Sequence, residues 1–357
     1  MPAGPEAITP PWLTAALRDG GALDASSAVV RIAVASIGER GGVNGETARL
    51  RLDYEGAPGP ASLIAKFPAP RDGALGVATF QRWYEREVRF YDELAPQGAI
   101  ATPRRYFAAL ESPAQYVLLL EDLEPAHRLG DQLAGATLAE AEAAVEAIAR
   151  FHARWWEHPT LVDHPWMPFT TVGLHNAGPV GGAFASAWAT VSQAPGEPLP
   201  AAVAPLIDRA VERYPALLEA ASAPPVTVIH GDFRLDNLFF DPSGAVTTID
   251  WQFTSRCRGA YDLAYFVGLN LDAATREAHE AALQQRYVDV LREHGVERYD
   301  LDQCRRDYAL GLLLSFAVFT IGAAGEQPNE RMRAVHATGL QRLAGAILHA
   351  GTEAWLR

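Results

Sequence analysis

The sequence predicts an α+β protein built in two parts, and three observations support this prediction. The chain has 357 residues, which is longer than one compact core usually holds. Residues 1–122 are rich in short strand-like runs separated by glycine and turn residues, whereas helical periodicity dominates residues 123–357. We therefore expect a small antiparallel sheet with one packed helix, followed by a larger and mainly helical domain.

The first part begins with a helix and continues as a β-meander. Thr9-Pro10-Pro11 before residues 12–18 is typical of a capped helix start. Apolar and aromatic residues at helical spacing predict a second helix over residues 80–94. The five predicted strands are residues 29–37, 47–54, 62–67, 105–110 and 115–120.

The second part opens with a strong helix over residues 137–156. Thr137 is its expected N-cap, and Glu140 is the capping-box partner three residues later. From residue 184 onward the pattern is mainly helical, and the segments rich in proline and glycine at 160–179 and 193–205 are expected to be loops.

Residues 308–325 form an uncharged run that is long enough to cross a membrane. The run contains glycine and serine at four positions, lies deep inside a globular sequence and has no companion span. A buried core helix is therefore the favoured interpretation, and we expect no membrane partner.

Composition narrows the class of protein. Hydrophobic content of 49% with 20% charged residues indicates a soluble globular chain, and a net charge of −13 argues against nucleic-acid binding. That charge is compatible with a cationic substrate, although acidic surfaces usually serve solubility. Two cysteines, Cys257 and Cys304, are expected to be free thiols, and the N-terminus lacks signal-peptide features. A cytoplasmic location follows as an expectation, and the oligomeric state is left open.

The most informative segment reads H-G-D-F-R-L-D-N over residues 230–237, and I-D-W follows at residues 249–251. Strand-like runs flank both pieces, and their spacing suits phosphoryl transfer from Mg-ATP. Asp232 is the predicted catalytic base, which accepts the proton of the attacking hydroxyl. Asn237 and Asp250 offer the oxygen ligands that Mg²⁺ prefers, and Arg234 is placed to bind the transferred phosphoryl group.

Other residues of these motifs have structural interpretations. A surface loop with an Asx cap would explain H-G-D taken alone, but not together with Asn237 and I-D-W. His230 is expected to brace the loop by hydrogen bonding. Asp236 fits a solvent-exposed turn or a substrate contact equally well. Asp262, in G-A-Y-D-L-A, is expected to anchor the catalytic turn through the backbone amides of that turn.

Lys66 lies in the largely apolar run S-L-I-A-K-F, where a lysine is costly unless its ammonium is paired. Glu87 on the following helix is the predicted partner, and the pair would hold the lysine against the α- and β-phosphates of ATP. Glu85 is the alternative partner, but Glu87 shares a helical face with neighbouring tyrosines. An exposed lysine on an edge strand would explain Lys66 without any site.

Two backbone segments complete the expected nucleotide site. The glycine-rich stretch of residues 36–47, with Gly42 and Gly45, would let backbone amides approach the phosphates. An ordinary glycine-rich hairpin is the simpler interpretation of that stretch. The apolar strand ending in Glu121 and Leu123 would present backbone groups to the adenine edge.

These motifs resemble the aminoglycoside phosphotransferase and choline kinase superfamily, the small-molecule relatives of protein kinases. H-G-D-F-R-L-D-N, I-D-W-Q and G-A-Y-D-L-A carry the resemblance, and Lys66, R-E-V-R-F-Y and L-L-L-E-D-L match in order. The E-D-L and D-W-Q elements look similar to the ecdysteroid-kinase-like branch and to related bacterial phosphotransferases. The resemblance implies a bilobal protein-kinase-like fold, Mg-ATP and phosphorylation of a substrate hydroxyl.

The chain departs from the protein-kinase pattern in two places. Its glycine-rich loop does not fit G-x-G-x-x-G, and Asp250-Trp251-Gln252 replaces Asp-Phe-Gly. The hinge-like glycine and the Ala-Pro-Glu signature are both missing, so the resemblance implies neither an activation-loop switch nor a protein substrate.

The leading hypothesis is therefore an ATP-dependent phosphotransferase acting on a small hydroxyl-bearing molecule, bound near Trp155, Trp156, Trp166 and Trp188. Core packing is the alternative role of those tryptophans. A nucleotide-binding pseudokinase without turnover is the rival hypothesis. A metal-dependent hydrolase using His152, His158 and His164 is disfavoured, because these residues lack i, i+4 spacing.

Overall fold

The computed structural model describes residues 1–37, 45–70, 72–124, 126–194, 198–325, 327 and 329–357. The chain divides into two compact units. Unit 1 is Met1–Arg128 together with Thr247–Gln252, and unit 2 is Leu129–Val246 together with Phe253–Arg357. The short segment Thr247–Gln252, which carries Asp250, therefore packs with residues that lie far upstream in the sequence.

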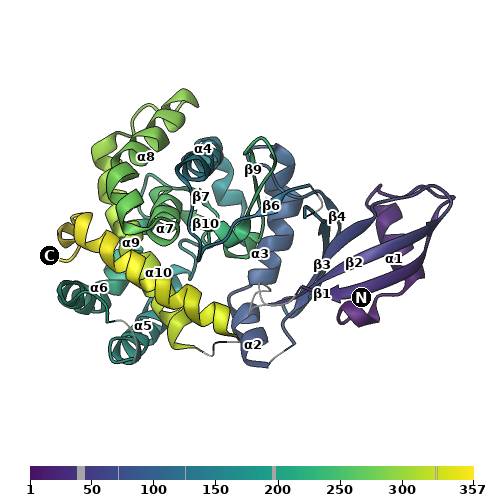
Figure 1. Cartoon of the computed structure of the whole chain (residues 1–357), viewed down its shortest axis with the longest axis horizontal. Coiled ribbons are helices and arrows are strands. Elements are labelled where there is room, and N and C mark those ends of the chain that lie inside the picture. Colours follow the sequence, from purple (N-terminus) through teal and green to yellow (C-terminus); the bar gives the residue numbers. More distant parts are fainter. Residues whose placement is uncertain (38–44, 71, 125, 195–197, 326, 328) are drawn as a thin grey trace. The chain divides into compact units, whose positions relative to one another are not determined.

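Unit 1 is built on a five-stranded antiparallel sheet, as the sequence predicts (Figure 1). The order across the sheet is β1–β2–β3–β5–β4, so β3 lies in the centre between β2 and β5. The strands are β1 (Ala28–Ser36), β2 (Gly45–Glu55), β3 (Ser62–Pro68), β4 (Arg105–Ser112) and β5 (Gln115–Glu121).

Helix α1 (Pro10–Asp19) packs on one face of this sheet. Leu13 and Leu17 of α1 join Leu50, Leu63 and Leu119 in one buried cluster. The burial of β3 alternates residue by residue, and its members of this cluster are Leu63, Ala65 and Phe67. Because side chains alternate between the faces of a strand, the side chain of Lys66 points away from α1.

The region after β3 differs from its prediction in detail. Instead of one helix over residues 80–94, the structure has α2 (Asp72–Phe80), α3 (Trp83–Arg89) and a π-helical turn, Phe90–Leu94. The break lies at Arg82, whose φ of 55° is left-handed and cannot continue an α-helix. Helix α3 contacts β4 and β5 and places Glu87 in the interior.

Unit 2 is mainly helical, and its short strands surround the motif residues. Its helices are α4 (Leu138–Trp155), α5 (Ala177–Val191), α6 (Ala204–Ser222), α7 (Ala260–Asn270), α8 (Ala273–Glu293), α9 (Leu301–Ala324) and α10 (Glu330–His349). The strands β7 (Thr227–Ile229) and β10 (Ser255–Cys257) pair antiparallel. The remaining strands form a small sheet in the order β6 (Arg128–Leu129), β8 (Leu238–Phe240), β9 (Val246–Thr248).

The predicted cap of α4 is present in full. The Glu140 amide donates to the Thr137 hydroxyl, and the Glu140 carboxylate accepts from the Thr137 amide at 2.8 Å. This reciprocal pair satisfies two of the amides that a helix start leaves without intrahelical partners.

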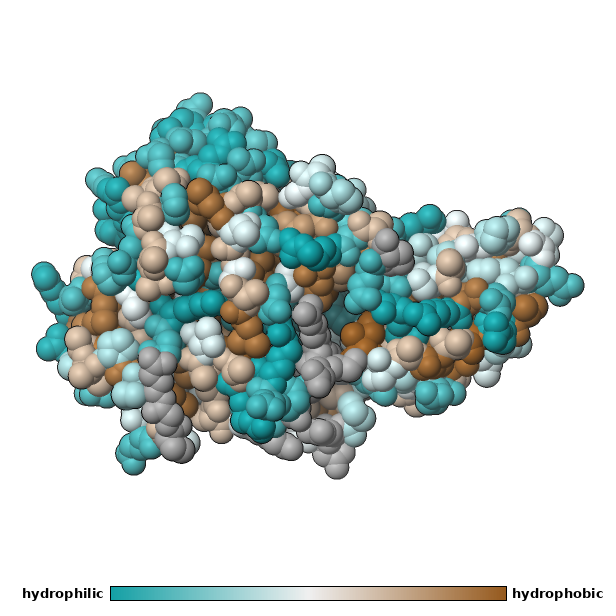
Figure 2. Space-filling view, viewed as in Figure 1, coloured by the Kyte–Doolittle hydropathy of each residue, from teal (hydrophilic) through white to brown (hydrophobic). Residues whose placement is uncertain are grey.

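Helix α9 is long and apolar enough to cross a membrane, but 72% of its apolar window is buried in the protein. It contacts α5, α6, α7, α8 and α10, which makes it the central helix of unit 2. Helix α8 contrasts with it, because the surface over α8 is almost entirely hydrophilic in Figure 2. The interpretation of residues 308–325 as a buried core helix agrees with this packing.

Candidate active site

Lys66 lies between two carboxylates in unit 1. Its Nζ donates to Glu87 Oε1 at 2.5 Å and to Asp250 Oδ1 at 2.7 Å, and its side chain is 13% exposed. The ion pair expected between Lys66 and Glu87 is therefore present. The alternative partner, Glu85, pairs with Arg82 at 2.6 Å.

The two carboxylates keep this lysine charged. Burial alone would favour the neutral amine, but the attraction of Asp250 and of Glu87 outweighs burial and raises the pKa of Lys66 above its ordinary value. Lys66 is also the only lysine in the chain, since the other 29 of its 30 lysine and arginine residues are arginines. The presence of a single lysine is therefore a further signal in the sequence for this site, beside the motifs.

Asp250 is held by its own backbone and by its neighbour Trp251. Its φ of 66° is in the left-handed region, which is uncommon for a residue other than glycine. Trp251 is fully buried and stacks on Phe90, with ring centroids 3.8 Å apart and planes within 6°. Since Trp251 adjoins Asp250, this stack holds the segment that carries the carboxylate in one position.

In unit 2 the catalytic turn follows β7. Gly231 has a φ of 88°, and a Cβ there would lie 2.7 Å from the carbonyl oxygen of Phe253, so only glycine fits. Asp262 accepts from the amides of His230 at 2.7 Å and of Gly231 at 2.9 Å. His230 Nδ1 accepts from the Asp232 amide at 3.2 Å. The predicted anchoring by Asp262 and bracing by His230 are both present.

Asp232 is buried, and three side chains orient its carboxylate. Oδ1 accepts from the hydroxyl of Tyr265 at 2.7 Å, and both oxygens lie 3.1 Å from Nε of Arg234. Asn237 Nδ2 donates to Oδ2 and to the main-chain oxygen of Asp232, each at 2.9 Å. The sequence analysis did not identify Tyr265, which lies one helical turn after Tyr261 of the G-A-Y-D-L-A motif.

Further arginine and carboxylate side chains surround Arg234. Its Nη1 donates to Gln132 Oε1 at 2.9 Å and contacts Asp236 at 3.4 Å. Arg331 of α10 donates to Asp236 at 3.0 Å and to Asp131 at 2.9 Å. Burial alone would lower the pKa of Arg234, but Asp232 and Asp236 raise it above its ordinary value. Asp236 is thus neither an exposed turn residue nor a free carboxylate, because two guanidinium groups hold it.

The backbone candidates for nucleotide binding are only partly described. Gly42 lies outside the described residues. Gly45 opens β2, and a Cβ there would lie 3.1 Å from the carbonyl oxygen of Phe67. The Glu121 amide donates to the carbonyl of Arg104, and the Leu123 carbonyl accepts from two later amides. Any adenine contact must therefore use other backbone groups of Glu121 and Leu123.

The donor set suits Mg²⁺ better than a transition metal. No group of three or more His, Cys, Asp or Glu residues that could hold a metal ion occurs among the described residues. Asn237 uses its amide nitrogen on Asp232, and nothing in the described part of the chain donates to its Oδ1. Asn237 Oδ1 in unit 2 and the Asp250 carboxylate in unit 1 are each the kind of oxygen ligand that Mg²⁺ prefers.

The histidines of the hydrolase hypothesis do not gather into a metal site. His152 contacts Tyr287 at 2.8 Å and Asp262 at 3.1 Å, so it supports the anchor of the catalytic turn. His158 Nδ1 bonds to Thr160 at 2.7 Å. Within the described chain these contacts are structural.

The tryptophans proposed for the acceptor pocket pack in the interior. Trp155, Trp166 and Trp188 are buried, and Trp188 donates to Asp208 at 2.8 Å. Trp156 lies edge-on to Tyr299. Core packing therefore describes these four side chains.

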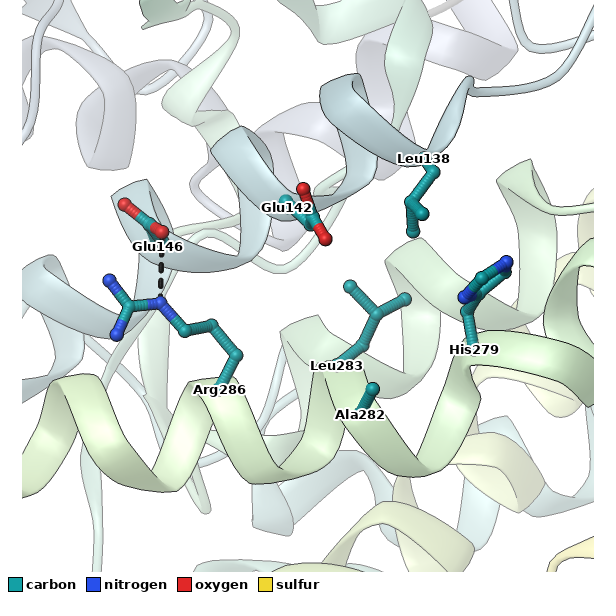
Figure 3. Close-up of a pocket in the computed structure, with 7 residues that line it drawn as sticks. All are labelled: Leu138, Glu142, Glu146, His279, Ala282, Leu283 and Arg286. Carbon is teal, nitrogen blue, oxygen red and sulfur yellow. Dashed lines mark hydrogen bonds and ion pairs between the residues drawn. The ribbon is translucent and has the colours of Figure 1, made fainter.

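One pocket of unit 2 is lined by none of the predicted site residues (Figure 3). It has a volume of about 300 Å³ and lies between α4 and α8. Arg286 donates to Glu146 across it at 2.9 Å. The other lining residues are Leu138, Glu142, His279, Ala282 and Leu283. None of these side chains belongs to the residues predicted for phosphoryl transfer.

The sequence matches the model of the phosphotransferase enzyme family over residues 56–301, which is more than half of the chain. The chain belongs to this family. The match includes Lys66, Asp232, Asn237 and Asp250, so this phosphotransferase carries all four motif residues inside the family region. A search of curated proteins gave no significant match.

Solved structures show that the phosphotransferase has the protein-kinase-like fold of aminoglycoside and choline kinases. A provisionally named aminoglycoside phosphotransferase from Ralstonia eutropha aligns with a TM-score of 0.57 at 15% identity, over 95% of this chain and 97% of the other. A choline kinase from Cryptosporidium parvum gives 0.57 at 9% identity, over 91% and 93%. The GDP and kanamycin complex of APH(2″)-IIia gives 0.54 at 12% identity, over 91% and 95%.

Proposed function

We propose that this phosphotransferase transfers the γ-phosphoryl group of ATP, bound with Mg²⁺, to a hydroxyl group of a small molecule. The pairing of Lys66 with both Glu87 and Asp250 carries the proposal. Kinase chemistry needs the lysine–glutamate pair and the metal-binding aspartate in place together, and one ammonium joins them here. The similar structures named for choline kinase and for a kanamycin complex support a small-molecule acceptor.

In this proposal Asp232 orients the acceptor hydroxyl and takes its proton. The acceptor oxygen bonds to the γ-phosphorus, the bond from that phosphorus to the bridging oxygen breaks, and ADP leaves with the bonding electrons. Arg234 Nη2 has no partner among the described residues, which leaves two N–H groups for oxygens of the transferred group. Bound Mg²⁺ would neutralise phosphate charge, and Asn237 and Asp250 would hold it.

The test compares the wild type with Asp232→Asn in a transfer assay with γ-labelled ATP and a panel of alcohols. We expect turnover to fall by about 10²- to 10⁴-fold while nucleotide affinity is retained, because an amide cannot accept the proton. Asp289→Asn, on the exposed surface of α8, is the matched control and should leave turnover unchanged. GTP is assayed beside ATP because one similar structure contains GDP.

The rival pseudokinase gives a different result in the same experiment. It would bind the nucleotide in both the wild type and Asp232→Asn and would transfer phosphate in neither. Equal turnover in the wild type and in Asp232→Asn would contradict the role of Asp232.

A further inference from the structure

The carboxylates around Asp232 are already paired with arginines. We call Asp131, Gln132, Asp232, Arg234, Asp236 and Arg331 the acceptor-side cluster, because the acceptor hydroxyl must approach Asp232. Arg234 contacts Asp232 and Asp236, and Arg331 contacts Asp236 and Asp131. Each carboxylate of the cluster therefore has at least one guanidinium partner.

A third guanidinium, that of Arg342, borders the cluster, and its charge interacts with the Asp272 carboxylate outside the cluster. Arg342 donates to the main-chain oxygens of Gln132 at 2.7 Å, Leu269 at 2.9 Å and Leu133 at 3.2 Å. No ion pair to Arg342 occurs among the described residues.

The polar groups that remain unused in the cluster are donors. Gln132 is 1% exposed, its Oε1 accepts from Arg234, and its Nε2 has no partner in the described part of the chain. Arg234 Nη2 is likewise unused there, and Arg331 contacts both of its carboxylates through Nη2 alone. Unused N–H groups next to the catalytic base suit oxygen atoms of a ligand and repel an ammonium group.

His336 of α10 is a neutral side chain on which the charges of Arg234 and Asp232 both act. Its Nδ1 lies 2.7 Å from Gln327 Oε1, and the Gln327 amide nitrogen donates to three carbonyls, so Nδ1 carries the proton. Burial, and then the charge of Arg234, lower the pKa of His336 to about 4. Burial is the main cause, and the charge of Asp232 opposes that of Arg234.

We propose that the acceptor has no ammonium group next to its reacting hydroxyl, and that it is a neutral, oxygen-bearing alcohol of the polyol type. This inference rests on the proposed function and adds the class of acceptor to it. An ammonium group within a few bonds of that hydroxyl would meet Arg234 and Arg331, and every carboxylate of the acceptor-side cluster already has a guanidinium partner. A polyol would instead accept hydrogen bonds from Gln132 Nε2 and from the N–H groups of Arg331 that its carboxylates do not use, while Arg234 binds the transferred group.

Matched pairs of acceptors test the inference directly. The pairs are choline with 3,3-dimethylbutan-1-ol, ethanolamine with ethylene glycol, and glucosamine with glucose, each differing at the group near the hydroxyl. Transfer from γ-labelled ATP gives kcat/KM for both members. We expect the neutral member to be at least tenfold better. An ammonium member that equals or exceeds its neutral partner would overturn the inference.

Arg331→Gln tests the physical cause, because it removes a positive charge and leaves Asp236 and Asp131 with fewer partners. We expect the preference to move about tenfold toward the ammonium members, and an unchanged ratio would count against the inference. Arg286→Gln, in the α4–α8 pocket, is the matched control and should leave the ratio unchanged. Thermal unfolding and nucleotide affinity establish that each variant is folded.

The inference and the proposed function fail in different ways. The inference fails if the active protein gives an ammonium acceptor a kcat/KM that equals or exceeds that of its neutral partner. The proposed function fails when no alcohol receives phosphate and Asp232→Asn leaves nucleotide turnover unchanged.

Discussion

Tyr265 orients Asp232 through its hydroxyl group, which donates a hydrogen bond to the carboxylate. Burial, and then the charge of Asp232, raise the pKa of Tyr265 well above its ordinary value, so it remains protonated and donates. The carboxylate of Asp232 therefore accepts hydrogen bonds from Tyr265, Arg234 and Asn237. Such bonds fix the position of the carboxylate, which matters when catalysis depends on placing the acceptor in line.

We expect Tyr265→Phe to lower kcat about tenfold with little change in the KM for the nucleotide, because one hydrogen bond to a charged group is lost. Steady-state kinetics with the nucleotide and the acceptor varied separately provide the measurement. Tyr308→Phe is the matched control, since its hydroxyl donates to Glu280 at 2.9 Å, outside the contacts of Asp232. An unchanged kcat for Tyr265→Phe would show that Arg234 and Asn237 suffice.

His336 provides a second prediction for a single residue. With a pKa of about 4 it is neutral through the physiological range. As the pH falls, the unfolded chain takes up a proton on His336 before the folded protein does, because the pKa is lower in the folded protein. The contribution of neutral His336 to stability is therefore complete above about pH 6.5 and is lost as the pH falls toward 4. A ¹H–¹⁵N titration should show the Nδ1–H tautomer and a midpoint near 4. A midpoint near 6.5 would contradict the assigned surroundings.

At the scale of elements, β3, α3 and the segment Thr247–Gln252 form one arrangement in unit 1. The alternation of β3 turns Lys66 toward α3, where Glu87 is 1% exposed. The stack of Trp251 on Phe90 fixes the segment that brings Asp250 to the lysine. The geometry around Lys66 thus depends on the packing of aromatic side chains as well as on ion pairs.

Lys66→Met should destabilise unit 1 and should do so more at high pH. Removing the ammonium leaves Glu87 and Asp250 without their partner, a change that typically costs about 3 kcal/mol in buried pairs. Burial already raises the pKa of Glu87, and a raised carboxylate pKa adds stability as the pH falls through it.

Denaturant unfolding of the wild type and Lys66→Met at pH 8 and at pH 5 provides the measurement. The difference in unfolding free energy should shrink at pH 5. Arg31→Met, which breaks an exposed pair with Asp53, is the control and should cost less than about 1 kcal/mol at either pH. A cost of Lys66→Met that is the same at both values would contradict the burial of Glu87 as the cause.

At the scale of the whole molecule, the division into units does not follow the order of the chain. Unit 1 takes Thr247–Gln252 from the middle of the sequence of unit 2. That segment supplies Asp250 to Lys66 and Trp251 to Phe90. We therefore expect residues 1–128 alone to be an incomplete unit.

Two fragments test this expectation. Residues 1–128 alone should unfold at lower denaturant concentration than the same residues joined by a flexible linker to residues 245–254. The linked fragment should lose the advantage when Trp251 is replaced by Ala, because the stack on Phe90 is then absent. Equal stability of the two fragments would show that the segment adds nothing to unit 1.

Much of the fold could be predicted because it depends on local pattern. Alternation identified the five strands of the sheet, and the pair Thr137 and Glu140 identified the start of α4. The break at Arg82 was missed, since the left-handed conformation of a single arginine leaves no periodic signal. Within the candidate site, Asp232 and Asn237 could be predicted because they lie on one short turn, and Asp262 could be predicted because it lies in the G-A-Y-D-L-A motif at the start of α7.

The sequence by itself determined the family and the fold class of this protein, because motif spacing, strand alternation and capping act over a few residues. Only the tertiary structure decided which distant groups meet. Asp250 reaches Lys66 across 184 positions, and Arg331 neutralises Asp236 from 95 positions away. Such pairs depend on how helices and strands pack, which no local pattern specifies. The paired state of the carboxylates near Asp232, and with it the expected class of acceptor, is therefore a property of the folded chain.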